Sequence, residues 1–190
     1  MLKKSITKEE LRNLPLTSFE QEIIVIENRV QFEHYLPELY LENVLGFDTE
    51  TRPSFKKGIK NKVSLLQLAT QEKAYLFRLN KIGLPNELAK FMASPDHLKI
   101  GAAIRDDLKA LKKLSPFEPA GFIELQDYVK NFGIENESVQ KIAGIVLNIR
   151  ISKSARLSNW EAAKLTQKQK KYAATDAWVC LESYNVLSNI

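Results

Sequence analysis

The chain contains 190 residues, of which 44% are hydrophobic and 27% are charged, as in an ordinary globular domain. No run approaches eighteen apolar residues, and no apolar stretch follows the N-terminal lysines, so we expect neither a membrane span nor a secretory signal, and a cytoplasmic location. Lys and Arg total 28 against 23 Asp and Glu, and the net charge of +5 is compatible with a polyanionic partner without requiring one.

The sequence predicts a single domain preceded by a short arm. No internal repeat, low-complexity tract or Ser/Gly-rich linker divides the chain. We assign residues 1–21 to the arm and residues 22–190 to the domain. The lone Cys180 cannot form an internal disulfide, which fits a reducing compartment, and we expect it in the core. No obligatory protein partner is indicated.

The first half of the chain is predicted to be rich in strands. Short apolar or alternating runs separated by turn residues are typical of β-structure, and three of these runs follow one another with short connections. We therefore expect an antiparallel meander. The predicted elements are a strand at 22–26, a helix at 29–41 with Val30, Tyr35 and Leu39 among its apolar positions, and strands at 44–50, 62–70 and 73–79.

From Pro85 onward strands and helices alternate. A meander followed by alternation indicates a mixed sheet with helices on both faces, and so an α/β fold with five to six strands. The predicted elements are a helix from residue 86, strands at 98–103 and 121–125, helices at 104–114, 126–132 and 138–147, and a long helix from about Thr166.

Two carboxylates, Asp48 and Glu50, end the strand at 44–50. Because side chains alternate along a strand, these two share one face while Phe47 and Thr49 take the other. Two like charges side by side repel each other unless a cation lies between them. For an isolated pair, a strand that simply runs out into solvent is the favoured explanation. The pair indicates a functional site only if further carboxylates converge on it.

The helix at 104–114 carries two adjacent acids with different orientations. With about 100° per residue, Ile104, Leu108, Leu111 and Leu114 form the buried stripe, and Asp107 falls on that side. Asp106 is predicted to lie outward near Lys113, as a first-turn residue favoured by the helix dipole. An inward carboxylate requires a cation or strong hydrogen-bond donors, so Asp107 is the candidate functional residue.

The long C-terminal helix places Tyr172 and Asp176 four residues apart and therefore on one face. A pair of this kind is commonly an ordinary contact on a helix surface. The pair becomes a candidate functional site only together with the other three acids, Asp48, Glu50 and Asp107.

Taken together, these motifs resemble the tyrosine-bearing branch of the DEDD superfamily of 3′–5′ exonucleases. The resemblance covers the chain from about residue 22, and it is strongest to Werner-type exonuclease domains and to ribonuclease D. It rests on GFDTET with the basic loop after it, KVSLLQLAT, KIGAAIRDDLKAL, RLSNW and YAATDAW. It implies a ribonuclease-H-like three-layer fold. It also implies a catalytic set of Asp48, Glu50, Asp107 and Asp176, with Tyr172 as the family tyrosine.

Some positions depart from related patterns. Lys109 stands where Werner-type domains carry an aromatic residue, and Lys171 stands where the sibling branch carries a histidine. The two histidines, His34 and His97, lie outside every motif and are interpreted as structural.

The chemistry implied by the resemblance is phosphodiester hydrolysis with two divalent metal ions. The four carboxylates offer only hard oxygen ligands, which suit Mg²⁺ or Mn²⁺ rather than zinc. By the same resemblance Tyr172 orients the attacking water. An unperturbed phenol titrates near about 10, so positioning fits this residue better than general-base catalysis.

Two basic regions are candidates for contact with a nucleic-acid backbone: the loop 52–62, with Lys57 and Lys60, and the segment 150–171, with Lys153 and Arg156. A solvated basic surface explains any one of these residues equally well. Trp160 is expected in the core, with base stacking as the alternative.

The leading hypothesis is a metal-dependent 3′–5′ exonuclease acting on DNA or RNA 3′ ends. DNA is favoured because ribonuclease D-like chains usually carry additional helical domains after the exonuclease domain. The alternatives are RNA 3′-end trimming of the ribonuclease D type and a nucleic-acid-binding module that has lost catalysis. The intact set of carboxylates counts against the last, because such a module has no use for their mutual repulsion.

Overall fold

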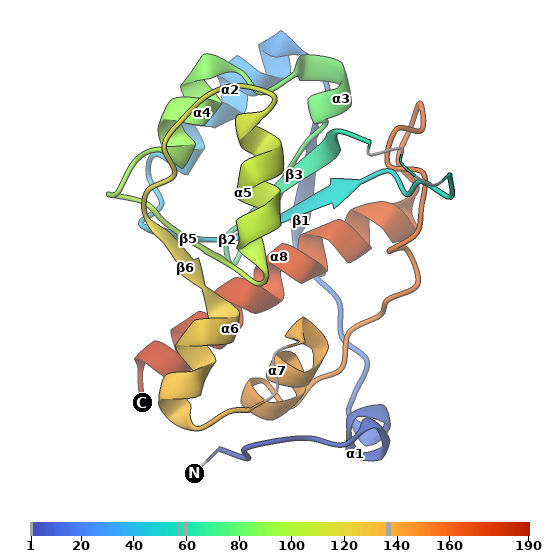
Figure 1. The fold of residues 1–190 in the computed structure, drawn as a ribbon, viewed down its shortest axis with the longest axis vertical. Coiled ribbons are helices and arrows are strands. Elements are labelled where there is room, and N and C mark those ends of the chain that lie inside the picture. Colours follow the sequence, from blue (N-terminus) through green and yellow to red (C-terminus); the bar gives the residue numbers. More distant parts are fainter. Residues whose placement is uncertain (1, 57, 59–60, 136–137) are drawn as a thin grey trace.

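A six-stranded mixed sheet forms the centre of the computed structural model, which describes residues 2–56, 58, 61–135 and 138–190 (Figure 1). The strand order is β1-β4-β3-β2-β5-β6. The predicted antiparallel meander is confirmed, and β1 and β5 add to its two sides in parallel. The strands are β1 (Glu22–Ile26), β2 (Val44–Thr51), β3 (Val63–Ala69), β4 (Lys73–Phe77), β5 (Leu98–Gly101) and β6 (Phe122–Glu124).

Helices cover both faces of the sheet, which confirms the predicted α/β fold (Figure 1). On one face, Phe32 of α2, Phe91 of α4 and Leu111 of α5 pack in one cluster with Phe47 of β2. On the other face lies α8. The helices are α1 (Lys8–Asn13), α2 (Arg29–Leu39), α3 (Leu79–Ile82), α4 (Asn86–Met92), α5 (Ile104–Lys112), α6 (Leu125–Tyr128), the 3₁₀ helix η1 (Val129–Phe132), α7 (Val139–Val146) and α8 (Gln167–Ser188).

Helix α2 differs from the prediction in its end and in its buried face. It ends at Leu39 instead of residue 41, and Val30 is 77% exposed. The buried positions are Phe32 and Leu39. Val30 precedes Phe32 by two residues, or about 200° around the helix, so both cannot face the sheet.

Helix α8 starts where the sequence predicts. Thr166 is its N-cap and forms a reciprocal capping box with Gln169, whose side chain accepts a hydrogen bond from the Thr166 backbone. Such a box satisfies two backbone donors that the first helical turn leaves unpaired. The helix runs for 22 residues across the sheet, so it carries residues near its start to the end of β2.

Gly46 sets the distance between β2 and α8. A Cβ atom at this position would overlap the backbone carbonyl of Ala177. Any larger side chain would push the helix from the sheet. Since Ala177 follows Asp176 and Gly46 precedes Asp48 by two residues, this close approach brings the two carboxylates toward each other.

The N-terminal arm packs on the domain. Ile6 and Phe19 are 5% and 1% exposed, and the Phe19 amide donates to the hydroxyl of Thr175 on α8 at 3.0 Å. The arm also pairs with the segment after α7, where the amide of Thr17 donates to the carbonyl of Arg150 at 2.9 Å. Among the residues described, no helix has the length and apolar character needed to cross a membrane.

Candidate active site

The end of β2 extends beyond its neighbour on one side. The pairing of β2 with β5 ends at Gly46 and Ile100, while its pairing with β3 continues past Glu50. Asp48 and Glu50 therefore lie where β2 has a strand on one side only, and α5 occupies the space beyond β5. This edge leaves room for side chains from outside the sheet to approach the two acids.

Three of the predicted carboxylates meet at this edge. One oxygen of Asp48, one of Glu50 and one of Asp176 lie within 4.8 Å of one another. Asp48 and Glu50 come from β2, as the alternation predicts, and Asp176 comes from α8. Three carboxylates this close are mutually repulsive when ionised, so the arrangement requires protons or cations.

The pKa values reflect this repulsion and the burial of the site. Burial, followed by the charges of Asp176, Glu50 and Asp107, holds the pKa of Asp48 well above its usual value. Burial and the charges of Asp176 and Asp107 raise the pKa of Glu50 to about 9, against the opposing charge of Arg156. Burial also raises the pKa of Asp176 to about 6, although its hydrogen bond with Tyr172 acts in the other direction.

Asp107 lies beside this trio but outside it. Its Oδ1 accepts a hydrogen bond of 2.5 Å from the hydroxyl of Thr49, which projects from the opposite face of β2. Burial raises the pKa of Asp107 to about 6, while the Thr49 hydrogen bond lowers it. The sequence identified Asp107 but gave no signal for its partner Thr49.

Asp106 is oriented as expected, away from the site. Its side chain is 91% exposed and forms an ion pair of 3.2 Å with Lys109, one helical turn further along, instead of lying with Lys113. The pairing also explains the lysine at position 109, which serves a surface contact here.

A residue that the sequence analysis missed fixes the start of α5. Ala103 adopts a left-handed conformation with φ 58° and offers no capping side chain. The carboxylate of Glu124, from β6, accepts hydrogen bonds of 2.9 Å from the amides of Ala103 and Ile104. Glu124 therefore caps the helix that carries Asp107. Because Glu124 lies twenty residues away from Ile104 in the sequence, no local motif predicts this cap.

Tyr172 lies between the carboxylate trio and the core. Its hydroxyl shares a hydrogen bond with Asp176, and burial together with the charges of Asp176 and Glu50 raises its pKa above the usual value. The ring packs against Trp160, with 6.0 Å between ring centroids. Trp160 is fully buried, so it is a core residue and base stacking is excluded for it.

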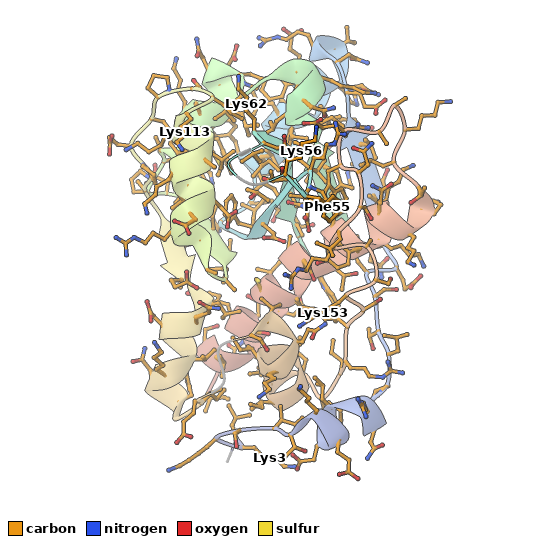
Figure 2. All side chains as sticks on the ribbon, turned by 45° about the vertical axis from the view of Figure 1, so that its right-hand side comes forward. Lys3, Phe55, Lys56, Lys62, Lys113 and Lys153 are labelled. Atoms are coloured by element: carbon orange, nitrogen blue, oxygen red, sulfur yellow. The ribbon has the colours of Figure 1, made fainter. Side chains whose placement is uncertain are left out.

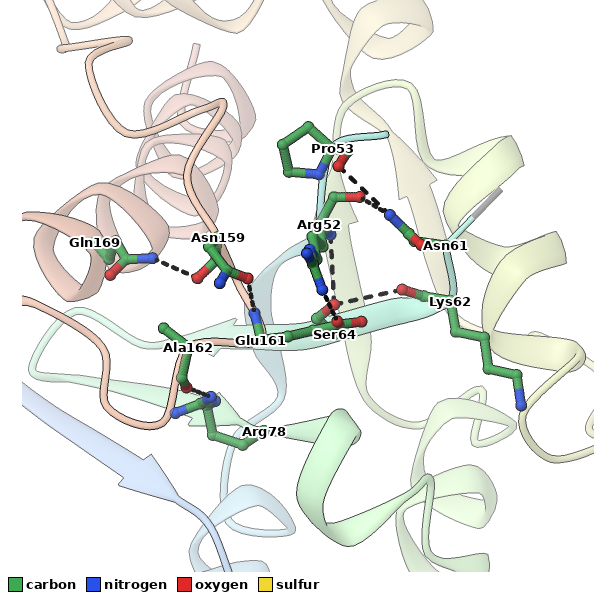
Figure 3. A network of polar contacts seen from close by, with 10 residues as sticks. All are labelled: Arg52, Pro53, Asn61, Lys62, Ser64, Arg78, Asn159, Glu161, Ala162 and Gln169. Carbon is green, nitrogen blue, oxygen red and sulfur yellow. Dashed lines mark hydrogen bonds and ion pairs between the residues drawn. The ribbon is translucent and has the colours of Figure 1, made fainter. Parts of the chain in front are cut away.

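A polar network holds the segment that carries Trp160 (Figure 3). Gln169 of α8 donates to the carbonyl of Asn159 at 3.2 Å, and the buried Arg78 donates to the carbonyl of Ala162 at 2.5 Å. Arg52, which follows β2, forms an ion pair of 3.1 Å with Glu161. Three separate elements thus fix the backbone on both sides of Trp160.

The predicted basic residues fall into two groups. Lys153 and Arg156 act electrostatically on Asp176 and Glu50 respectively, so the structure places them at the edge of the site. Figure 2 shows Lys153 on the same side of the molecule as Lys56 and Phe55, and Phe55 is 86% exposed, a feature that the sequence analysis did not single out. Lys57 and Lys60 lie outside the described residues.

The histidines, the cysteine and Lys171 named in the sequence analysis form contacts within the fold. Nδ1 of His97 lies 2.7 Å from the carbonyl of Glu42. The ring of His34 packs edge-on against Tyr35. Cys180 is buried and free, as expected. Lys171 forms an ion pair of 2.6 Å with Glu20 of the arm.

The site fits divalent metal ions. Its donor atoms are carboxylate oxygens that converge within 4.8 Å, and burial together with the mutual repulsion of the acids raises the pKa values of Asp48 and Glu50. Hard divalent cations prefer such oxygen ligands.

Comparison with known proteins identifies the family. A family model described as 3′-5′ exonuclease matches residues 23–190. Among curated proteins, the chain is 33% identical over 155 residues to the bifunctional 3′-5′ exonuclease/ATP-dependent helicase WRN of Mus musculus, covering 78% of this chain and 11% of that protein. It is 29% identical over 127 residues to ribonuclease D of Haemophilus influenzae, covering 66% of this chain and 32% of that protein.

Among solved structures, the Aedes aegypti Nibbler EXO domain superposes with a TM-score of 0.81 at 25% identity, covering 91% of each chain. The chain spans only a small part of the curated relatives, but nearly the whole of this single domain. The family model, the relatives and the shared fold agree with the resemblance in the motifs. The chain belongs to the 3′–5′ exonuclease family.

Proposed function

We propose that this protein is a metal-dependent 3′–5′ exonuclease that hydrolyses phosphodiester bonds with two Mg²⁺ or Mn²⁺ ions. Membership of the family makes it a nuclease that hydrolyses nucleic acid, and enzymes of this kind use divalent metals. The observation that carries the proposal is the convergence of Asp48, Glu50 and Asp176 within 4.8 Å at a buried edge of the sheet. Such an arrangement is costly for the fold unless cations neutralise it.

Each carboxylate has a distinct proposed role. Asp48, Glu50 and Asp176 would hold one ion together, and Asp48 with Asp107 would hold the second. Asp107 lies beside the trio with a hydroxyl partner, so it can reach the second position from α5. When bound, two such ions supply an activated water and stabilise the charge on the departing 3′ oxygen.

Tyr172 is proposed to position the attacking water. Because its pKa is raised, the phenol stays protonated near neutral pH and acts as a hydrogen-bond donor rather than as a base. Its hydroxyl is directed toward Asp176, and Trp160 supports the ring from behind. A fixed donor next to the ligand set restricts where a water molecule can sit.

Lys153 and Arg156 are proposed to contact the phosphates of the substrate strand. Both act on the carboxylates of the site, and among the described residues neither forms an ion pair with an acid. Cations in this position are available to phosphate oxygens and give affinity without base specificity. Lys57 and Lys60, in the loop after β2, remain predicted contacts of the same kind.

DNA is the proposed preferred substrate, with RNA 3′-end trimming as the alternative. The similarity to ribonuclease D supports the alternative. A module without catalytic activity is disfavoured because it has no need of three mutually repulsive acids, one buried and two half-buried. A cytoplasmic location remains part of the proposal.

The test is digestion of end-labelled DNA and RNA of matched sequence, side by side, with Mg²⁺ or Mn²⁺. The proposal expects cleavage of both strand types to require metal and cleavage of DNA to be faster. Faster cleavage of RNA favours the ribonuclease D alternative. Binding of both strands without cleavage under any metal condition contradicts the enzymatic proposal and supports the binding module.

A further inference from the structure

Gln67 is a buried amide with no partner in the structure. Its side chain lies on β3 and is 1% exposed. Within the part of the chain that the structure describes, neither Nε2 nor Oε1 forms a hydrogen bond. Buried polar side chains are nearly always hydrogen-bonded, because leaving donor and acceptor unpaired costs the free energy of removing both from water. An orphaned amide inside a well-packed sheet therefore indicates a partner that forms in another state of the protein.

The position of Gln67 identifies that partner. In the antiparallel pairing of β2 and β3, Gln67 lies directly opposite Asp48. Directly opposite residues share a face of the sheet, with Cβ atoms about 4.5–5.5 Å apart, so a glutamine side chain can reach across. The face they share is the one covered by α8, which carries Asp176.

The other neighbours of Gln67 within the sheet offer no hydrogen-bonding side chain. On the opposite side, β4 places Leu76 beside it. Along β3, the residues two before and two after are Leu65 and Ala69, which belong to apolar clusters with α8. Of the four nearest positions on the sheet, only Asp48 has a side chain that can accept a hydrogen bond from the amide.

We propose that Gln67 is a positioning residue for Asp48: its Nε2 amide donates to the carboxylate when the site holds its metal ions. Asp48 contributes one oxygen to the carboxylate trio. An ionised carboxylate has about four acceptor sites on its two oxygens, so the second oxygen can accept a hydrogen bond and still take part in holding the second ion. A donor on that second oxygen fixes the rotation of the carboxylate and aims the first oxygen at the metal. Ligating carboxylates are commonly held by such outer hydrogen bonds, and losing one costs about 10–100-fold in metal affinity or activity.

This inference rests on the proposed function. It predicts that one substitution leaves thermal stability unchanged or raises it, and that the same substitution lowers metal affinity. Gln67→Met keeps a similar shape and removes both unpaired polar atoms. In excess EDTA, the variant should therefore unfold at the same temperature as the wild type or at a higher one. In contrast, its affinity for Mn²⁺ should fall by about tenfold or more. A glutamine with a merely structural role would lower the melting temperature and leave Mn²⁺ binding unchanged.

The matched control is Ser183→Ala. Ser183, also on α8, is 1% exposed, and its hydroxyl likewise lacks a partner. It lies seven residues beyond Asp176, away from the carboxylates. Removing this second orphaned group should leave Mn²⁺ affinity at the wild-type value. Gln67→Leu provides a second apolar variant in case methionine perturbs the packing.

The experiment measures Mn²⁺ binding by isothermal titration calorimetry and thermal unfolding in EDTA for wild type, Gln67→Met, Gln67→Leu and Ser183→Ala. A cleavage assay at increasing Mn²⁺ should show a raised half-saturation point for the Gln67 variants, with the rate recovering at saturation. If wild type binds Mn²⁺ and cleaves, and the Gln67 variants bind it equally well, the inference about Gln67 is wrong and the proposed function stands. If wild type neither binds Mn²⁺ nor cleaves, the proposed function itself fails.

Discussion

The hydroxyl of Thr49 donates a hydrogen bond of 2.5 Å to Oδ1 of Asp107, and so joins the strand between the two β2 carboxylates to helix α5. Thr49 points to the face opposite Asp48 and Glu50. The bond therefore joins β2 to α5 beyond the last β2–β5 pair, Gly46 and Ile100. It holds Asp107 beside the group formed by Asp48, Glu50 and Asp176, of which Asp107 is not a member.

This geometry predicts different effects on activity for substitutions at the two adjacent acids of α5, Asp106 and Asp107. Asp107→Asn should remove nearly all turnover, because it removes a charged ligand that the second metal position requires. Asp106→Asn should retain most activity, since Asp106 is 91% exposed and forms an ion pair with Lys109 on the helix surface. The measurement is the single-turnover cleavage rate of a labelled strand by each variant. A larger loss from Asp106→Asn would contradict the assignment.

Tyr172 and Asp176 share a hydrogen bond and are expected to respond differently to substitution. Tyr172→Phe keeps the ring against Trp160 and removes only the hydroxyl, so kcat should fall by about 10²–10⁴-fold while Mn²⁺ binding stays near wild type. Asp176→Asn should weaken Mn²⁺ binding as well. Titrating Mn²⁺ into both variants and measuring single-turnover cleavage distinguishes the two. Cleavage by Tyr172→Phe at the wild-type rate would make the tyrosine a packing residue.

Lys153 and Arg156 are predicted to act through phosphate contacts. Replacing both with alanine should weaken binding of single strands of any sequence and flatten the slope of log K against log salt by about 1.4, at about 0.7 per phosphate. Lys90 on α4, on the other face of the sheet, is the control: Lys90→Ala should leave the slope unchanged. The slope is measured by fluorescence anisotropy at several salt concentrations. A loss restricted to one base sequence would indicate base readout instead.

The raised pKa values predict how the stability of the metal-free protein depends on pH. Glu50 has a pKa of about 9 in the folded state against an ordinary 4.5, so between these values the folded state retains a proton that the unfolded chain has lost. Its contribution is fully favourable below about pH 4.5 and is lost as the pH rises toward about 9. Asp107 and Asp176, at about 6, act in the same direction over a lower range.

The melting temperature in EDTA should therefore fall between about pH 6 and about pH 9, and Glu50→Gln should make this dependence shallower. Saturating Mn²⁺ should oppose the trend, because the ligands bind metal only when deprotonated. Differential scanning fluorimetry across this pH range provides the measurement. Parallel pH profiles for wild type and Glu50→Gln in EDTA would contradict the pKa assignment.

The sequence predicts the sheet, the helices and the inward acid of α5 because these follow from local patterns. Alternation places Asp48 and Glu50 on one face, helical phase separates Asp107 from Asp106, and the capping box at Thr166 fixes the start of α8. Each of these signals lies within about ten residues of chain.

Other features depend on contacts between distant segments, and no local pattern reports them. Glu124 caps α5 from a different strand, and Thr49 reaches an acid 58 residues away. Lys99 is fully buried in β5, where its ammonium group donates to the carbonyl of Ser94 at 2.8 Å, although lysine usually indicates an exposed position. Val30 shows the converse, because an apolar residue at the start of α2 lies on the exposed face.

The central claim is that the carboxylates Asp48, Glu50, Asp107 and Asp176 hold metal ions that cleave a strand from its 3′ end. The most direct measurement follows a 5′-labelled strand incubated with Mn²⁺, with excess EDTA, and with the Asp48→Asn variant as a matched control for contaminating nuclease. The account predicts a ladder of labelled products that shortens one nucleotide at a time, present only for wild type with metal. Undiminished cleavage in EDTA, or release of the 5′ label as the first product, would contradict it.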